Sequence, residues 1–307
     1  MTTPTPDLAR LVAPVKRIDA YLSEVLNSEL HGYPPALQDA MRYAVLQGGK
    51  RLRPLLTWYS CEAFGVTGEA ALPACAAVEF VHAFSLVHDD LPALDNDDLR
   101  RGKPTLHKHA GEAMAILAGD ALLNFAYRHL SCRFESCEGL VFSLSDATGR
   151  MIAGQVRDTL GGFDPKLSLR EKVELVHSEK TGALIYAACY MGYVCALMEL
   201  VRNAKSKPPK LPIDFHKSLA PFAWNIGLIF QIVDDLIDLE QSADHAGKRT
   251  GKDASAGKLT FPAVFGAQGS RDEVARLKAK ALERLEVLGP PAQPLRDLCE
   301  YLSTRTQ

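Results

Sequence analysis

Residues 87–95 read VHDDLPALD and residues 232–239 read IVDDLIDL, and each stretch ends a long apolar run with paired aspartates. Along most of the chain, apolar residues recur with the period of an α-helix, whereas the alternation typical of a strand is nearly absent. Two apolar helices that end in similar acidic clusters are expected to face each other across one cavity. The sequence therefore predicts an all-α protein.

Length and composition limit the number of domains and the class of protein. The chain has 307 residues, 47% hydrophobic and 23% charged, which is typical of a globular protein with one or two domains. Because the two aspartate stretches lie in separate halves but are expected to share a cavity, we predict one helical domain over residues 15–307, after a flexible tail over residues 1–14. The formal net charge of −2 is too small to attract nucleic acid or an anionic membrane.

Features tied to cellular location point to the cytoplasm. The seven cysteines include no CxxC pair, and an odd number does not fit a disulfide framework. The first ten residues, MTTPTPDLAR, lack the basic and apolar segments of a secretory signal. The uncharged stretch 182–198 is shorter than the roughly 20 residues that a membrane span needs. We expect that stretch to form a buried core helix.

The aspartates themselves predict a magnesium site. At 100° per residue, Asp234 and Asp238 lie about 40° apart on one helix face, where two carboxylates repel unless a cation lies between them. Asp95 would point about 240° away from Asp89 on a straight helix, so Pro92 is expected to end that helix and let Asp95 loop back. Oxygen ligands alone favour Mg²⁺, which also binds substrate phosphates.

Positive charges lie close to both aspartate stretches and predict an anionic substrate. GGKRLRP at 48–54 places three cations on a glycine-containing turn that enters a helix, and Arg100 and Arg101 follow the first aspartate stretch. Lys180 precedes an apolar helix, and lysines punctuate residues 241–258. Since these cations alternate with acidic clusters, they fit a small diphosphate better than a nucleic acid.

A series of motifs in a fixed order resembles the trans-isoprenyl diphosphate synthases, specifically the short-chain farnesyl diphosphate synthases of bacteria. The motifs are GGKRLRP at 48–54, EFVHAFSLVHDDLPALDNDDLRRGKPT at 79–105, GDALL at 119–123, GQVRD at 154–158, EKTGALI at 179–185, FQIVDDLID at 230–238, GK at 247–248, GKD at 251–253 and GKLTFP at 257–262. The resemblance implies an isoprenoid-synthase-type helical bundle around a central cavity, about three Mg²⁺ ions and a homodimer. It implies head-to-tail joining of isopentenyl diphosphate to an allylic diphosphate such as dimethylallyl or geranyl diphosphate.

The resemblance also implies a role for each matching residue. Metal binding is expected of Asp89, Asp95 and Asp234, and of Asp158, although Arg157 stands where the family carries an apolar residue. The catalytic set is Asp89, Asp90, Asp95, Lys180 and Asp234, with Asp235 and Asp238 as secondary carboxylates. Isopentenyl diphosphate should contact Lys50, Arg53, His82 and Arg101. The allylic diphosphate should contact Arg100, Lys180, Thr181, Gln231, Lys248 and Lys258.

Product length is predicted from Phe84 and Ser85. Phe84 lies five residues before Asp89, about 7.5 Å along a helix, so a prenyl chain held at the metals would meet its ring. An aromatic residue here resembles the enzymes that make C15 products, and farnesyl diphosphate is therefore the expected product. The alternatives are a geranylgeranyl or geranyl diphosphate synthase and, from a different class, a non-catalytic regulatory subunit of a heteromeric prenyltransferase.

Overall fold

A computed structural model describes residues 7–204, 214–244 and 259–305, with side chains described up to Glu240 in the second range. Its main helices are α1 (Leu8–Ser28), α2 (Pro35–Leu46), α3 (Leu52–Glu62), α4 (Leu72–Asp89), α5 (Leu106–Ala110), α6 (Glu112–Arg133), α7 (Glu138–Leu160), α8 (Leu169–Val176), α9 (Ala183–Asn203), α10 (Leu219–Asp244), α12 (Phe261–Leu285) and α13 (Gln293–Thr304). Within the described ranges, the only strands are β1 (Leu99–Arg100) and β2 (Lys103–Pro104), which pair antiparallel. The prediction of an all-α fold is confirmed.

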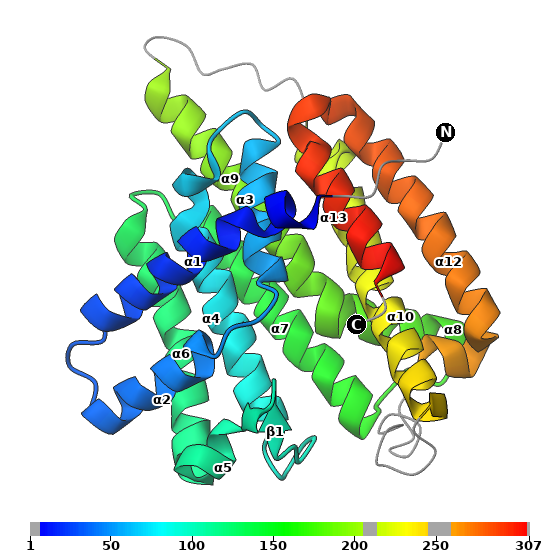
Figure 1. The fold of residues 1–307 in the computed structure, drawn as a ribbon, viewed down its shortest axis with the longest axis horizontal. Coiled ribbons are helices and arrows are strands. Elements are labelled where there is room, and N and C mark those ends of the chain that lie inside the picture. The colour runs from blue at the N-terminus through cyan, green and yellow to red at the C-terminus, as the bar shows by residue number, and fades with distance from the viewer. Residues whose placement is uncertain (1–6, 205–213, 245–258, 306–307) are drawn as a thin grey trace.

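The two aspartate-bearing helices lie inside a layer of other helices (Figure 1). Helix α4 packs against α6, α3 and α9, and α10 packs against α9 and α12. Both helices are apolar on all sides along most of their length, and a helix of this kind is buried in the core. Phe80 of α4 and Phe222 of α10, for example, are fully buried. The stretches that end these helices are therefore carried on rigid, buried elements.

The N-terminal helix begins earlier than the sequence predicts. Asp7 accepts hydrogen bonds from the backbone N–H groups of Ala9 (3.1 Å) and Arg10 (3.3 Å), and so caps α1 at Leu8. Leu11 is 3% exposed, and the Tyr59 hydroxyl donates to its carbonyl oxygen at 2.8 Å. The expected flexible tail is thus wrong for residues 8–14, which the cap and the core contact hold in a helix.

Two described segments, Gly68–Asp89 and Leu169–Asn203, are long and apolar enough to cross a membrane by composition alone. In the fold, 72% and 50% of their most apolar windows are buried. Core helices of globular proteins pass the same test, and Ala187, Ala188 and Cys189 within the uncharged stretch are fully buried. The prediction of a buried core helix over 182–198 is confirmed.

One close helix contact positions a predicted site residue. Residues His177–Gly182 form a π-helical turn before α9, a distortion that frequently marks functional sites. Gly154 of α7 approaches this turn so closely that a Cβ atom there would lie 2.3 Å from the backbone nitrogen of Lys180. The absence of a side chain at Gly154 therefore lets Lys180 sit against α7.

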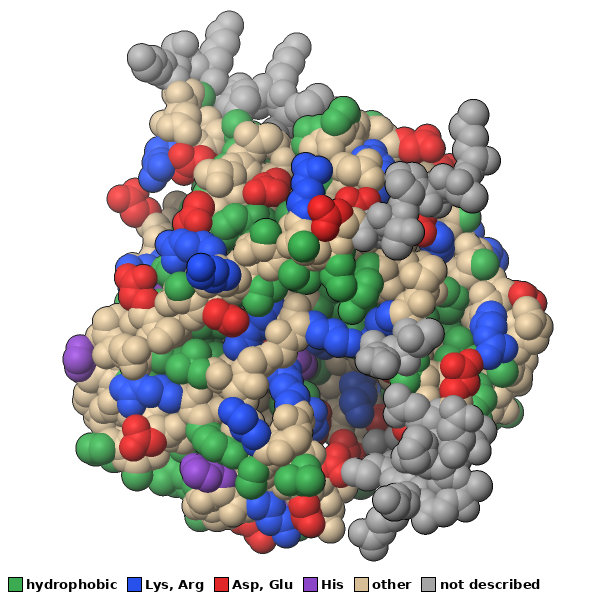
Figure 2. Space-filling model, viewed as in Figure 1, with side chains coloured by type: hydrophobic (Ala, Val, Ile, Leu, Met, Phe, Trp, Pro, Cys, Tyr) green, Lys and Arg blue, Asp and Glu red, His purple; other side chains and the backbone are tan. Residues whose placement is uncertain are grey.

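The surface does not carry a continuous basic face in the view of Figure 2. Lys and Arg side chains there are interspersed with Asp and Glu side chains, and both kinds surround a hollow in the lower centre. This distribution agrees with the expectation that cations alternate with acidic clusters.

Candidate active site

The chain folds back after α4, as Pro92 predicts. The backbone N–H of Asp95 donates to the carbonyl oxygen of Asp89 at 2.8 Å, and that of Asp97 donates to the carbonyl oxygen of Asp90 at 3.3 Å. Proline cannot continue the helix, so α4 ends at Asp89 and a tight loop follows. The predicted return of Asp95 towards Asp89 is confirmed.

Asp89 lies in a partly desolvated cluster of carboxylates. Burial raises its pKa to about 6, and the nearby Asp95 and Asp90 carboxylates add to the rise, while Lys180 and Arg100 oppose it. Asp89 lines a cavity with a volume of about 330 Å³. A divalent cation stabilises the charged form of a partly buried carboxylate that lies beside other carboxylates.

Mg²⁺ binding is expected to depend on pH because of this shift. Below about pH 6, a proton competes with the metal for Asp89, so the apparent Mg²⁺ affinity should fall by about tenfold from pH 6 to pH 5. Isothermal titration of Mg²⁺ in the presence of inorganic diphosphate, near pH 7 and near pH 5, measures the change. The Asp89→Asn variant should lose most of this dependence, and an affinity that is equal at both pH values in the unchanged protein would contradict the assignment.

Asp90 and Arg100 form a tight pair. Arg100 donates from Nε to both Asp90 carboxylate oxygens, at 3.0 and 2.8 Å, and from Nη2 to Oδ1 at 2.6 Å. Asp90 is 3% exposed. Asp90 thus orients Arg100, and the charge of Arg100 acts on Asp89 from this fixed position.

The glycine-containing turn GGKRLRP separates its three cations. Gly49 has a φ of 134°, and a Cβ atom there would lie 2.6 Å from the guanidinium of Arg101, which also hydrogen-bonds to the Gly48 carbonyl. Arg51 turns into the core, where it pairs with Glu79 at 2.5 Å and Asp19 at 2.8 Å. The expectation of three available cations is therefore wrong for Arg51, because two buried acidic partners hold it.

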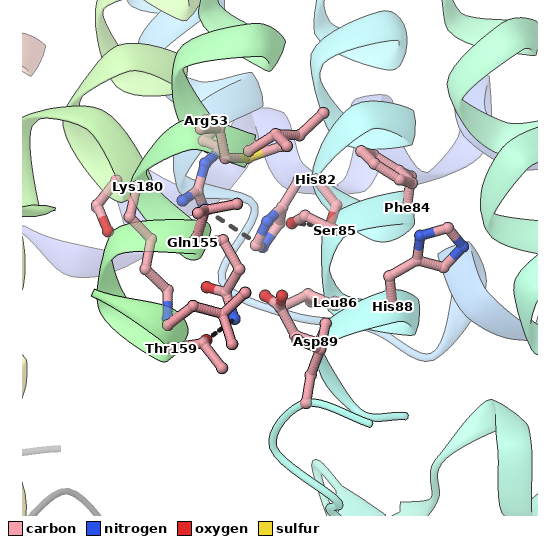
Figure 3. A pocket seen from close by; sticks show the side chains of 16 residues that line it. Arg53, His82, Phe84, Ser85, Leu86, His88, Asp89, Gln155, Thr159 and Lys180 are labelled. Carbon is pink, nitrogen blue, oxygen red and sulfur yellow. Dashed lines mark hydrogen bonds between the residues drawn. The ribbon is translucent and has the colours of Figure 1, made fainter. Parts of the chain in front are cut away.

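Arg53 and His82 form a half-buried polar wall of the cavity. Their side chains meet at 3.3 Å between Nη1 and Nε2 (Figure 3). Burial and then the Arg53 charge hold the pKa of His82 well below its ordinary value, so the imidazole is neutral. Arg53 Nε and His82 Nδ1 are buried and have no hydrogen-bond partner among the described residues. Unsatisfied buried nitrogen atoms of this kind fit an anionic oxygen of a substrate.

The second aspartate motif contacts Arg305, a residue that the sequence analysis did not identify. Arg305 Nη2 lies 2.5 Å from Asp234 Oδ1, and its guanidinium lies 4.3 Å above the ring of Phe230. Burial raises the pKa of Asp234, and Arg305, Lys50 and Arg53 oppose the rise. Asp234 thus lies near the predicted isopentenyl diphosphate residues Lys50 and Arg53, and Arg305 would compete with a metal for its Oδ1.

Lys180 and Asp158 pair across the other wall, at 2.6 Å between Nζ and Oδ2. Thr181 donates to Gln231 Oε1 at 2.8 Å, and Gln231 Nε2 donates to Asp235 Oδ1 at 3.1 Å. The other oxygen of Asp235 accepts the backbone N–H of Phe261 at 3.0 Å, at the start of α12. Asp235 therefore joins α10 to α12. Lys248 and Lys258 lie outside the described residues.

The cavity runs between α4 and α7. Figure 3 shows Arg53, His82, Asp89, Gln155 and Lys180 around one end of it, and Phe84 and His88 to the side on α4. Its lining consists of Arg53, His82, Phe84, Ser85, Leu86, His88, Asp89, Leu94, Met151, Ile152, Gln155, Val156, Thr159, Leu160, Lys180 and Thr181. The sequence did not predict that α7 lines the cavity, because this helix contains no charged motif apart from GQVRD at 154–158.

The donor set fits Mg²⁺ that is shared with a substrate. In the described part of the chain, no three His, Cys, Asp or Glu side chains are grouped so as to hold a metal ion by themselves. Mg²⁺ is often bound through one or two carboxylates and substrate phosphates, however, and Asp89 and Asp95 supply two such carboxylates. Burial, with the neighbouring carboxylates adding to it, raises the pKa of Asp89, and a bound cation would offset both effects.

Comparisons with known proteins agree with this fold. Residues 34–286 match the model of the family described as polyprenyl synthetase. The chain is 39% identical over 280 residues to a chloroplastic geranylgeranyl pyrophosphate synthase of Catharanthus roseus, covering 89% of this chain and 74% of that protein. It is 41% identical over 285 residues to the large subunit 1 of a heterodimeric geranylgeranyl pyrophosphate synthase of Arabidopsis thaliana, covering 89% and 73%.

Solved structures with the same fold include a geranyltransferase of Legionella pneumophila, with a TM-score of 0.80, 30% identity and 96% coverage of both chains. An FPP/GFPP synthase of Zymomonas mobilis has a TM-score of 0.78 and 33% identity, covering 96% of this chain and 99% of that one. The prediction of an isoprenoid-synthase-type bundle is confirmed. Together, the motif order, the site and these matches show that the chain belongs to the polyprenyl synthetase family of prenyltransferases.

Proposed function

We propose that this enzyme is a Mg²⁺-dependent short-chain trans-prenyltransferase that joins isopentenyl diphosphate to an allylic diphosphate. The observation that carries the proposal is that two polar groups lie close to each other at one end of the same cavity. Asp89 with Arg100 and Lys180 forms one polar group, and Arg53 with His82 forms another. Two groups of this kind fit the two diphosphates that the reaction brings together.

The chemistry requires a negative charge to be stabilised as the allylic carbon–oxygen bond breaks. Bound Mg²⁺ would neutralise the diphosphate that leaves. Lys180 and Arg100 add fixed positive charge near Asp89, and both are already held by carboxylates, so little reorganisation is needed. The buried apolar side chains of Met151 and Phe84 keep water from the allylic cation. Arg53 and His82 hold the second diphosphate so that its double bond meets that cation.

The product that the relatives favour is geranylgeranyl diphosphate. Curated relatives at about 40% identity are named geranylgeranyl pyrophosphate synthases, which supports the C20 alternative over the farnesyl product expected from the sequence. Farnesyl diphosphate is the second candidate, and the 7%-exposed Phe84 ring in the cavity wall is the observation that favours it. Sizing the dephosphorylated products from dimethylallyl, geranyl and farnesyl diphosphate primers separates the two. No product with any primer would overturn the proposal and favour a regulatory subunit.

Replacing Phe84 with Ala is expected to lengthen the main product by at least one isoprene unit. Phe84 precedes Asp89 by five residues, a rise of about 7.5 Å along α4. Removal of its ring therefore opens space for a chain held at the aspartates. Phe142→Ala removes a ring that is 74% exposed on α7 and does not line the cavity, so it serves as the matched control. Chromatography of the products measures the shift, and an unchanged length in Phe84→Ala would show that the floor lies elsewhere.

We also propose that the enzyme is a cytoplasmic homodimer that pairs through α6 and α7. Ile116 and Leu117 on α6 are 45% and 57% exposed, and Ile152 and Val156 on α7 are 46% and 48% exposed. Exposed apolar residues on neighbouring helices support an interface. Sedimentation of the unchanged protein and of Leu117→Glu tests it, with a dimer expected for the first and a monomer for the second. A monomer in both would contradict the proposed dimer.

A further inference from the structure

His88 precedes Asp89 directly but turns away from the aspartates. Figure 3 shows its ring beside Phe84, on the side of α4 opposite the polar end of the cavity. Its Nε2–H donates to the carbonyl oxygen of Ile116 on α6 at 3.1 Å, and the same nitrogen lies 4.0 Å from Asp120 Oδ1. No motif in the sequence assigns a function to this histidine. Its contacts tie the last turn of α4 to α6.

Gly119 provides the space that the His88 ring occupies. A Cβ atom at Gly119 would lie 2.1 Å from His88 Nε2 and 2.4 Å from Cδ2, which is closer than any real side chain permits. Gly119 opens the motif GDALL, to which neither the charge pattern nor the proposed chemistry assigns a role. Its conformation is helical and needs no positive φ, so the close approach of His88 is the feature that explains a glycine here.

His88 in turn supports Phe84, one helical turn earlier on the same face. The two ring centroids lie 5.0 Å apart with an interplanar angle of 75°, which is an edge-to-face pair. Both residues line the cavity that contains Asp89. Since His88 is fixed to α6 by a hydrogen bond and by the space at Gly119, the Phe84 ring cannot shift toward α6 without displacing it.

We infer that His88 is a positioning residue that determines product length, because it holds the Phe84 ring across the path of the growing prenyl chain and is itself seated by Gly119. The floor of the cavity thus depends on the rings of Phe84 and His88 on α4 and on Gly119 on α6, which makes room for His88. This inference rests on the proposed function, and it extends the control of product length from the residue that the chain meets to residues behind it.

The test compares product ratios in variants of the full-length enzyme. His88→Ala is expected to raise the ratio of the next longer product to the wild-type product at least tenfold, with KM for both diphosphates changed less than about twofold. His88→Gln keeps a side chain that can donate to the Ile116 carbonyl, and it should retain a ratio within about threefold of the wild type. The Tm of each variant is measured alongside to confirm that it is folded.

Gly119→Ala supplies an independent test because Gly119 does not line the cavity itself. Its methyl group should displace His88 and change the ratio at least threefold in the wild-type background. In the His88→Ala background, the same substitution should have no further effect, since the ring that it displaces is gone. Equal effects of Gly119→Ala in both backgrounds would overturn the coupling.

The outcomes separate failure of the inference from failure of the proposed function. An active wild-type enzyme whose product ratio is unchanged by His88→Ala, while Phe84→Ala lengthens the product, overturns the role of His88 alone. A His88→Ala enzyme that loses kcat or Tm without a change of ratio shows a purely structural residue and also overturns it. A wild-type enzyme that forms no prenyl product overturns the proposed function and the inference together.

Discussion

Asp89→Asn is expected to lower kcat by about 10³-fold while leaving the helical fold intact. Asp89 is the member of the half-buried Asp89–Asp95 pair whose pKa desolvation raises, and the neutral amide removes charge from the position where Mg²⁺ is expected to neutralise the leaving diphosphate. Because burial raises the pKa of Asp89, losing its charge should not destabilise the metal-free fold. Steady-state rates with saturating substrates, together with circular dichroism, measure both effects.

Asp98→Asn is the matched control for this substitution. Asp98 lies in the same acidic segment, but its side chain is 71% exposed and pairs with Lys108, which is 47% exposed. A surface pair of this kind contributes little, so kcat should stay within about twofold of the wild type. Similar losses in both variants would indicate that overall acidity of the loop matters and would contradict a specific role for Asp89.

The second large effect is expected on substrate affinity. Arg53→Met should raise KM for isopentenyl diphosphate by about 10²-fold and leave KM for the allylic diphosphate nearly unchanged. Arg53 is half-buried beside a neutral His82, and its buried Nε has no partner in the described structure, so a charge-assisted bond to a substrate oxygen would be unusually valuable there. Loss of one such bond costs up to about 3 kcal/mol of binding free energy. At about 1.4 kcal/mol per tenfold change, this corresponds to the expected 10²-fold rise in KM.

Two further variants make the affinity experiment decisive. Arg53→Lys keeps a charge but loses the planar fork, and an intermediate KM is expected. Arg17→Met removes an arginine that is 43% exposed and pairs with the exposed Glu69, and no change in either KM is expected. Equal rises in both KM values for Arg53→Met would show that Arg53 supports the whole cavity and does not select one diphosphate.

The sequence predicted the features that depend on local rules. Helical periodicity located the aspartate-bearing helices, and the inability of proline to continue a helix predicted the return of Asp95, which the Asp95–Asp89 backbone hydrogen bond confirms. The start of α1 at Leu8 was not predicted, because residues 1–14 were assigned to a flexible tail and Asp7 was not recognised as a helix cap. Its position one residue before a helix is a capping signal that the sequence also carries.

The features that escaped prediction depend on contacts between distant parts of the chain. Arg51 and Arg53 are indistinguishable in GGKRLRP, yet one is neutralised by Glu79 and Asp19 while the other faces the cavity. Arg305 stands alone near the end of the sequence, and only the packing of α13 brings it to Asp234. The role of each of these arginines depends on a partner residue from a distant part of the chain, and the local sequence does not identify that partner.

The contact between Gly154 and Lys180 also limits how this enzyme can be altered by evolution or design. Cavity-wall residues such as Met151 and Ile152 can change size, and the consequence is a different pocket shape. Any side chain added at Gly154 would instead push on the backbone that carries the cation, since its Cβ would lie 2.3 Å from the Lys180 nitrogen. Substrate range is therefore open to gradual variation in this scaffold, whereas the register between α7 and the π-helical turn is fixed, and adaptive paths should leave Gly154 unchanged.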